Sequence, residues 1–171
     1  MHWYAFKVFY NKVFEIEDLL NREKIETFVP CEMVLVEHNG TKKSVRKPVI
    51  SSLLFFCSTE QQALEQQQRL TDRVILYTRL VGWQKLPVAI PDREMNIFML
   101  VASSGEKGLE YFGEAPRDYC IGQRVRVTDG PFKGAEGYIH RIKGNRRLIV
   151  SIEGVCAVAT AYIPQCFIQK I

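Results

Sequence analysis

The sequence lacks the features that define several broad classes of protein. No apolar run approaches the roughly 18 residues that a membrane-spanning helix needs. The amino-terminal residues also lack the basic stretch and cleavage site of a signal peptide. We therefore expect a cytoplasmic protein that does not contact a membrane. Low-complexity segments and internal repeats are absent too, and 47% of the 171 residues are hydrophobic, which predicts a folded core rather than disorder.

Residues suited to catalysis or metal binding are scarce. The three histidines lie far apart in the sequence, and there is no Gly-x-Ser-x-Gly, phosphate-binding loop or His-Glu-x-x-His motif. The five cysteines are scattered, and no two have Cys-x-x-Cys spacing. This favours buried thiols in a reducing compartment over a zinc site or a disulfide framework. The sequence thus predicts a protein that is not an enzyme and uses no metal or cofactor. A catalytic site assembled only by the fold is the competing interpretation.

Positive charge is concentrated near the end of the chain, although the formal net charge is only +4. Residues 119–171 carry eight basic and three acidic side chains, whereas residues 1–102 carry 13 and 12. Such an excess can serve contact with RNA or with an acidic protein face, and it can also be an ordinary solvated surface. Charge alone does not choose between these interpretations.

The first hundred residues alternate between strand and helix patterns. The expected strands span 3–10, 32–37, 44–50, 53–58 and 74–80. Asn39-Gly40 predicts a hairpin turn between the second and third of them. The expected helices begin at an Asn11 cap, at a Thr59 capping box and at Pro91-Asp92. This order predicts an α+β sandwich over residues 1–102, in which helices pack on an antiparallel or mixed sheet.

A change in pattern separates this unit from the rest of the chain. Residues 103–118 break all periodicity and are expected to be a linker. Only strand patterns follow, over 124–128, 136–142, 147–152, 155–162 and 167–170. Five short strands in about 50 residues predict a small SH3-like β-barrel over residues 119–171.

The most specific signal is the first hairpin of that second unit. Alternating Val125 and Val127 lead to Asp129-Gly130-Pro131, which ends the strand because glycine accepts positive φ and proline lacks an amide donor. Gly134 and Gly137 then let the backbone turn back. This arrangement resembles the KOW module of the NusG family of transcription elongation factors, which act by binding rather than by catalysis.

The first unit is similar to the NusG amino-terminal domain, which usually precedes a KOW barrel. The matching segments are Trp3-Tyr4, Phe28-Val29-Pro30, Asn39-Gly40, Leu53-Leu54-Phe55-Phe56 and Ile90-Pro91-Asp92-Arg93-Glu94-Met95. The resemblance implies a monomer whose apolar patch binds RNA polymerase. That contact is carried onto five residues, here called the contact set: Ile50, Leu53, Phe55, Tyr77 and Tyr4. Each of them can instead belong to the core.

The barrel of the family's general factor uses a Phe-Gly-Arg turn to meet a ribosomal protein or the termination factor Rho. This chain has Glu153-Gly154-Val155 there, and it has Ser51-Ser52-Leu53 where the family has Pro-Gly or Pro-Asn followed by Tyr. The resemblance therefore implies a specialised UpxY- or RfaH-like paralogue, which antiterminates polysaccharide operons, with an altered partner. The residues expected to form the barrel's partner contact, here called the turn set, are Gly130, Pro131, Phe132, Gly134, Gly137, Ile152 and Glu153.

Specialised paralogues can also read the displaced non-template DNA strand. The donors available for this form the polar set: Gln66, Gln67, Arg69, Thr71 and Arg73. An ordinary polar helix and loop is the competing interpretation. Two further functions stay open, the general NusG factor and an RNA-binding or ribosome-associated KOW protein that holds phosphates through Arg141, Lys143, Arg146 and Arg147. Refolding of the barrel into helices is disfavoured, because residues 148–152 alternate as a strand does.

Overall fold

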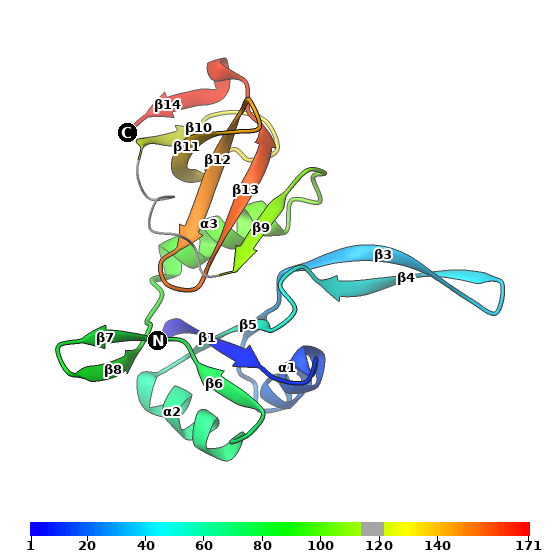
Figure 1. The fold of residues 1–171 in the computed structure, drawn as a ribbon, viewed down its shortest axis with the longest axis vertical. Helices are drawn as coiled ribbons and strands as arrows, with labels where there is room; N and C mark the ends of the chain where they lie inside the picture. Colours follow the sequence, from blue (N-terminus) through cyan, green and yellow to red (C-terminus); the bar gives the residue numbers. More distant parts are fainter. Residues whose placement is uncertain (114–121) are drawn as a thin grey trace.

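The computed structural model describes residues 1–113 and 122–171, which form two units that both pack against helix α3 (Asp92–Ala102) (Figure 1). Besides α3, the amino-terminal unit contains β1 (His2–Val8), α1 (Val13–Arg22), β2 (Thr27–Phe28), β3 (Cys31–His38), β4 (Thr41–Pro48), β5 (Leu53–Ser58), α2 (Glu60–Arg69), β6 (Val74–Leu76), β7 (Thr78–Val81) and β8 (Gln84–Pro87). The β unit contains β9 (Glu110–Gly113), β10 (Gln123–Val127), β11 (Glu136–Ile142), β12 (Asn145–Ile152), β13 (Cys156–Tyr162), a 3₁₀ turn η2 (Gln165–Phe167) and β14 (Ile168–Lys170). The predicted α+β class is confirmed.

The central sheet of the amino-terminal unit has the strand order β2-β5-β1-β6, and every pair in it is antiparallel. Ala5 lies opposite Phe55 and Phe6 lies opposite Leu54. Because side chains alternate along a strand, this register divides the apolar residues between two faces. One face carries Trp3, Ala5, Leu53 and Phe55, and the other carries Tyr4, Phe6, Leu54 and Phe56.

Helices α1 and α2 cover the face that carries Tyr4. Ile16 and Leu20 of α1 and Ala63 of α2 are buried there in one cluster. The amide of Gln62 donates to the Thr59 hydroxyl over 3.2 Å, which confirms the expected cap of α2. The Asn11 cap expected for α1 was wrong. Asn11 has φ 55°, and the helix begins two residues later with no side-chain cap.

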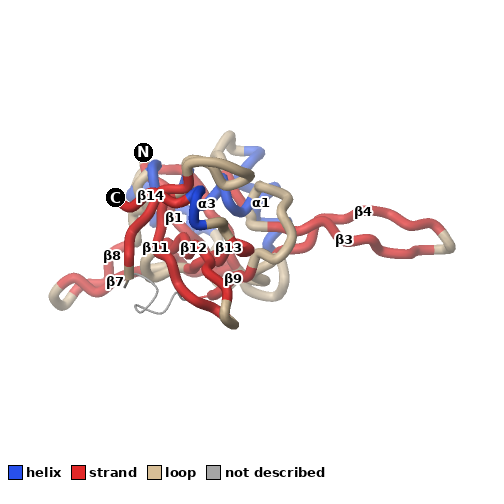
Figure 2. The backbone as a smooth tube through the Cα atoms, turned by 90° about the horizontal axis from the view of Figure 1, so that it is seen from above, coloured by secondary structure: helices blue, strands red, loops and turns tan. Residues whose placement is uncertain are grey.

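Two hairpins project from this unit on opposite sides (Figures 1 and 2). Strands β3 and β4 pair over their full length around Asn39-Gly40, as the sequence predicts. The second hairpin, β7–β8, was not predicted. The strand expected over 74–80 is divided at Tyr77, whose amide donates to the Ala5 carbonyl and whose carbonyl accepts from the Val88 amide. The chain then leaves the central sheet and turns at Gly82, which has φ 60°.

The β unit forms one antiparallel sheet in the order β14-β10-β11-β12-β13-β9. Strands β10 to β14 lie where the sequence predicts strands. Strand β9 falls inside the segment that was expected to be a linker. It pairs with β13, where Phe112 lies opposite Ala157. Residues 110–113 therefore belong to the sheet. The remainder of the expected linker after them, residues 114–118, lies outside the described residues.

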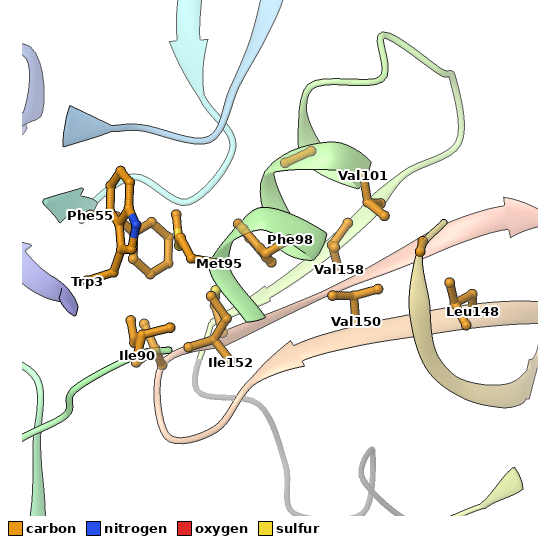
Figure 3. Close-up of a cluster of buried hydrophobic side chains, with 14 of the residues drawn as sticks. Trp3, Phe55, Ile90, Met95, Phe98, Val101, Leu148, Val150, Ile152 and Val158 are labelled. Atoms are coloured by element: carbon orange, nitrogen blue, oxygen red, sulfur yellow. The ribbon is translucent and has the colours of Figure 1, made fainter. Parts of the chain in front are cut away.

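Helix α3 joins the two units into one hydrophobic core. Met95 and Phe98 pack toward the sheet face that carries Phe55, and the same cluster continues to Val150 and Val158 of the β unit (Figure 3). Burial of a side chain of this size stabilises the fold by about 1.5–3 kcal/mol. The two units are therefore packed against each other, because both use one helix to bury apolar surface.

Candidate functional site

Two members of the contact set lie deep in the core. Leu53 and Phe55 are both 0% exposed, and the Phe55 ring lies 5.6 Å from the ring of Phe98 on α3. The expectation that these two side chains form a surface was therefore wrong for this structure. The reason is that α3 covers the sheet face on which both residues lie.

The sheet separates one of the other three members, Tyr4, from the remaining two. Ile50 and Tyr77 are partly exposed at the edge of the core that α3 covers. Tyr4 is buried on the opposite face, where its ring packs 6.1 Å from that of Phe56. Burial is the main cause that raises the pKa of its hydroxyl. Tyr4 cannot share a surface with Ile50, so its inclusion in the contact set was also wrong.

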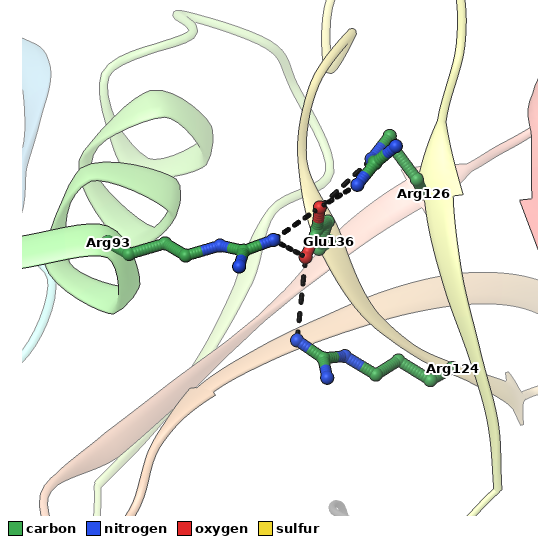
Figure 4. Close-up of polar contacts among 4 residues, drawn as sticks. All are labelled: Arg93, Arg124, Arg126 and Glu136. Carbon is green, nitrogen blue, oxygen red and sulfur yellow. Dashed lines mark hydrogen bonds and ion pairs between the residues drawn. The ribbon is translucent and has the colours of Figure 1, made fainter. Parts of the chain in front are cut away.

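A buried carboxylate joins α3 to the β unit. Glu136 of β11 has a side chain that is only 6% exposed, and arginines from both units surround it (Figure 4). Its oxygens accept from Arg126 over 2.7 Å, from Arg93 of α3 over 2.8 Å and from Arg124 over 3.4 Å. The hydrogen bond from Arg126 is the largest cause that lowers the Glu136 pKa, and Arg93 adds to it. Of these three pairs, only the one with Arg93 crosses between the units.

We expect Glu136→Gln to lower the free energy of unfolding at pH 7 by about 1–3 kcal/mol, because it leaves clustered arginines without their carboxylate. The effect is smaller than for a fully buried pair, since the guanidinium groups reach solvent. The pKa of the Glu136 carboxyl is lower in the folded protein than in the unfolded chain, where it is near 4.5. The ionised carboxylate therefore stabilises the fold at pH values above 4.5, and this stabilisation is lost as the pH falls through the folded pKa. Denaturant unfolding at pH 7 and pH 3 should therefore show a smaller difference between parent and variant at pH 3.

The matched control is Glu15→Gln, which removes an exposed carboxylate paired with Lys12 and Arg73. It should change stability by less than about 1 kcal/mol at either pH. An equal loss for the two variants at pH 7 would contradict the role assigned to Glu136.

Glu153 of the turn set lies at the seam between the units. It is exposed, and together with Glu94 and Ile97 of α3 it lines a cavity of about 300 Å³. Burial, and secondarily the charge of Glu153, raise the pKa of Glu94. The two carboxylates thus face each other across the seam. The turn expected to meet an external partner also lies against α3.

The rest of the turn set is largely structural. Phe132 and Ile152 are buried in the shared core. Gly130 and Gly134 have φ of 81° and 91°, which glycine adopts without strain. Gly137 leaves no room for a side chain, because a Cβ there would lie 2.2 Å from the Ile149 carbonyl oxygen. Pro131 is exposed and remains available to a partner.

The polar set is engaged within the amino-terminal unit. Arg69 pairs with Glu23, the residue that follows α1, and Gln66 donates to the same carboxylate over 2.8 Å. The Gln67 side-chain oxygen accepts from the Leu76 amide over 2.6 Å, which fixes α2 against β6. The two remaining members are also bonded: Thr71 donates to the Gln68 carbonyl over 2.5 Å, and Arg73 pairs with Glu15 over 3.4 Å. These contacts support the interpretation of an ordinary polar helix and loop.

The basic residues of the β unit fall into two groups, those bonded within the unit and those exposed to solvent. Arg147 donates to Glu110 over 2.6 Å and to the carbonyls of Gly108 and Thr160, so it fastens β9 to the sheet. Arg146 donates to the Gln165 side chain over 2.8 Å. Arg141 and Lys143 are exposed around the turn between β11 and β12. Arg141 lies opposite Arg146 in the β11–β12 register, so three of these four cations gather at the turn end of that hairpin.

Sequence reasoning missed two features. The first is the Arg93–Glu136 pair, for which the expected β10–β11 hairpin gave part of the signal, because Arg126 lies directly opposite Glu136 in that register. The second is the exposed tip of β7–β8, which carries Trp83. Among the described residues, no group of His, Cys, Asp and Glu could hold a metal ion, and no helix is long and apolar enough to cross a membrane.

A sequence model of one protein family, described as "Transcription termination factor nusG", matches residues 1–99. The matched segment includes the contact set, both projecting hairpins and most of α3. No curated protein matches the chain.

Proposed function

The chain belongs to the NusG family of transcription factors, and from this premise we propose that it is a specialised elongation and antitermination factor that binds RNA polymerase through its amino-terminal unit. NusG-family proteins act in transcription elongation and termination and are not enzymes. The match over residues 1–99 carries this proposal, because it covers the unit to which the polymerase contact is assigned.

The exposed fractions of the contact-set residues reduce the number that can touch the polymerase directly. Ile50 and Tyr77 lie partly exposed at the border of the core, and Leu53 and Phe55 support the sheet beneath α3. Ile50 and Tyr77 are therefore proposed to touch the polymerase directly. Leu53 and Phe55 are proposed to act through the shape of the unit, since side chains that are fully buried cannot form a contact without rearrangement.

The β unit covers part of the amino-terminal unit. It covers the face of α3 that carries Ile97 and Glu94. A partner that needs this face must displace the β unit, against the shared core and the Arg93–Glu136 pair. Assignment to a specialised paralogue rests on Glu153, whose charge replaces the apolar residue at the partner turn of the general factor. The general factor is the alternative within the family.

The test is retention of purified RNA polymerase from the source organism by the immobilised full chain. We expect Ile50→Glu to reduce retention about tenfold or more, because an unpaired charge in the desolvated centre of an interface is costly. Leu64→Glu is the matched control, since Leu64 is an exposed apolar residue on α2, and it should retain polymerase as the parent does. Circular dichroism confirms that each variant is folded.

Two outcomes would contradict this assignment. If the parent chain is folded and retains no polymerase, the proposed function fails, and the RNA-binding KOW protein becomes the next candidate to test. If Ile50→Glu and Leu64→Glu retain polymerase equally, the contact does not lie at Ile50.

A further inference from the structure

The tip of the β7–β8 hairpin carries a fully exposed tryptophan. Trp83 is 101% exposed, so both faces of its indole ring are open to solvent. It follows Gly82 in the turn between the two strands, which pair over Thr78–Val81 and Gln84–Pro87. The hairpin projects away from the central sheet, on the side of the molecule opposite β3–β4 (Figures 1 and 2). The indole contributes nothing to the core, and together with exposed Leu80 and Val81 it gives the tip a concentration of apolar surface of the kind that marks contact sites.

All charged side chains of the β7–β8 hairpin are positive. Arg79 and Lys85 lie on the two strands of the hairpin, and residues 78–87 contain no acidic side chain. Within residues 1–113 and 122–171, neither cation forms an ion pair. Because Arg79 lies opposite Leu86 and Lys85 lies opposite Leu80, the two cations lie on opposite faces of the hairpin, and each face offers one positive charge to an anionic ligand. Leu80, which lies opposite Lys85, adds exposed apolar surface beside it.

We propose that this hairpin tip binds single-stranded nucleic acid. Trp83 stacks on one base as the strand crosses the tip, and Arg79 and Lys85 contact the phosphates on either side of that base, one on each face of the hairpin. A free aromatic face beside cations is the arrangement that binds single strands without reading their sequence, because every base has a π-face. An apolar protein groove would suit Trp83 and Leu80, but it would not explain two unpaired cations without a carboxylate. The same contacts are available from DNA and RNA, so the site does not distinguish the two sugars.

The residues of this site are not those proposed to touch the polymerase, Ile50 and Tyr77. The site does not use the polar set either, whose side chains are bonded to α1, β6 and their own loop. Failure of the hairpin proposal would therefore leave the proposed function untouched, and the reverse is also true.

The experiment titrates the full chain with fluorescently labelled (dT)12 and (U)12, and follows anisotropy of the label and emission of the protein. Trp83 dominates any ligand-dependent emission change, because the only other tryptophan, Trp3, is buried. We expect both oligomers to bind with similar affinity and to quench Trp83. Trp83→Ala should weaken binding about five- to a hundredfold, the range for loss of one stacked base, whereas Trp83→Phe should stay within a few-fold of the parent.

The charge contribution is measured separately. Replacing both Arg79 and Lys85 with Gln should reduce the slope of log affinity against log salt by about 1.4, or about 0.7 for each phosphate contact. Tyr162→Ala removes an exposed aromatic residue from the β unit and should leave binding unchanged. Oligonucleotide binding that is absent at low salt, or that is equal in parent and Trp83→Ala, would overturn the proposal. Loss of polymerase retention in Trp83→Ala with unchanged oligonucleotide binding would also overturn it, and would assign the tip to a protein partner.

Discussion

Leu53→Asp should strongly destabilise the amino-terminal unit. Leu53 is fully buried on the sheet face beneath α3, in the cluster that also contains Phe55 and Phe98. Aspartate there would place a carboxyl group among apolar side chains and leave a cavity. We expect the free energy of unfolding to fall by about 4 kcal/mol or more, a large part of the 5–15 kcal/mol that stabilises a typical domain. Thermal unfolding followed by circular dichroism measures this.

The matched control is Leu35→Asp, which makes the same change on β3. Leu35 is 74% exposed, so this variant should lose less than about 1 kcal/mol. A Leu53→Asp protein that melts like the parent would show that residue 53 is accessible in solution. Loss of polymerase binding by such a folded variant would return Leu53 to the contact surface itself.

Gly137→Ala should destabilise the β unit by about 3 kcal/mol or more. A Cβ at this position would lie 2.2 Å from the Ile149 carbonyl oxygen and 3.2 Å from a Leu148 methyl carbon. The nearest obstacle is backbone, and β11 and β12 are held together by their pairing at Tyr138 and Ile149. Neither strand can move away without loss of the ladder hydrogen bonds. Denaturant unfolding measures the change.

Gly113→Ala is the control for that substitution. Gly113 ends β9, and within the described part of the chain a Cβ there would meet nothing within 4 Å, so the variant's stability should stay within about 0.5 kcal/mol of the parent. Equal stability of the two variants would show that the sheet accommodates a side chain at residue 137.

Most features that depend on residues close together in the sequence were predicted correctly. The cap at Thr59, the β3–β4 hairpin around Asn39-Gly40 and α3 from Asp92 all follow from the preferences of a few neighbouring residues. The strands of the β unit follow from alternation and turn glycines in the same way. Two local predictions failed at positive φ: Asn11 does not cap α1, and Gly82 turns the chain into an additional hairpin.

The alternation of side chains along β5 could not predict whether either face of this strand is exposed. It correctly separates Leu53 and Phe55 from Leu54 and Phe56, but both faces of the central sheet are covered, one by α1 and α2 and the other by α3. An apolar strand therefore predicts two packed faces as readily as one packed face and one contact surface. For this reason the contact set mixed buried residues with partly exposed ones.

The sequence by itself determined the family, the α+β class and the approximate place of the helices and strands, because each depends on motifs and periodicities only a few residues long. Only the tertiary structure decided that α3 packs against both units, that Glu136 gathers Arg93, Arg124 and Arg126, and that the polar set is bonded internally. It also decided that Trp83 stands free at the end of a hairpin. These features join or separate residues that lie far apart along the chain. They depend on which surfaces become covered when the units pack, and no short pattern in the sequence records that.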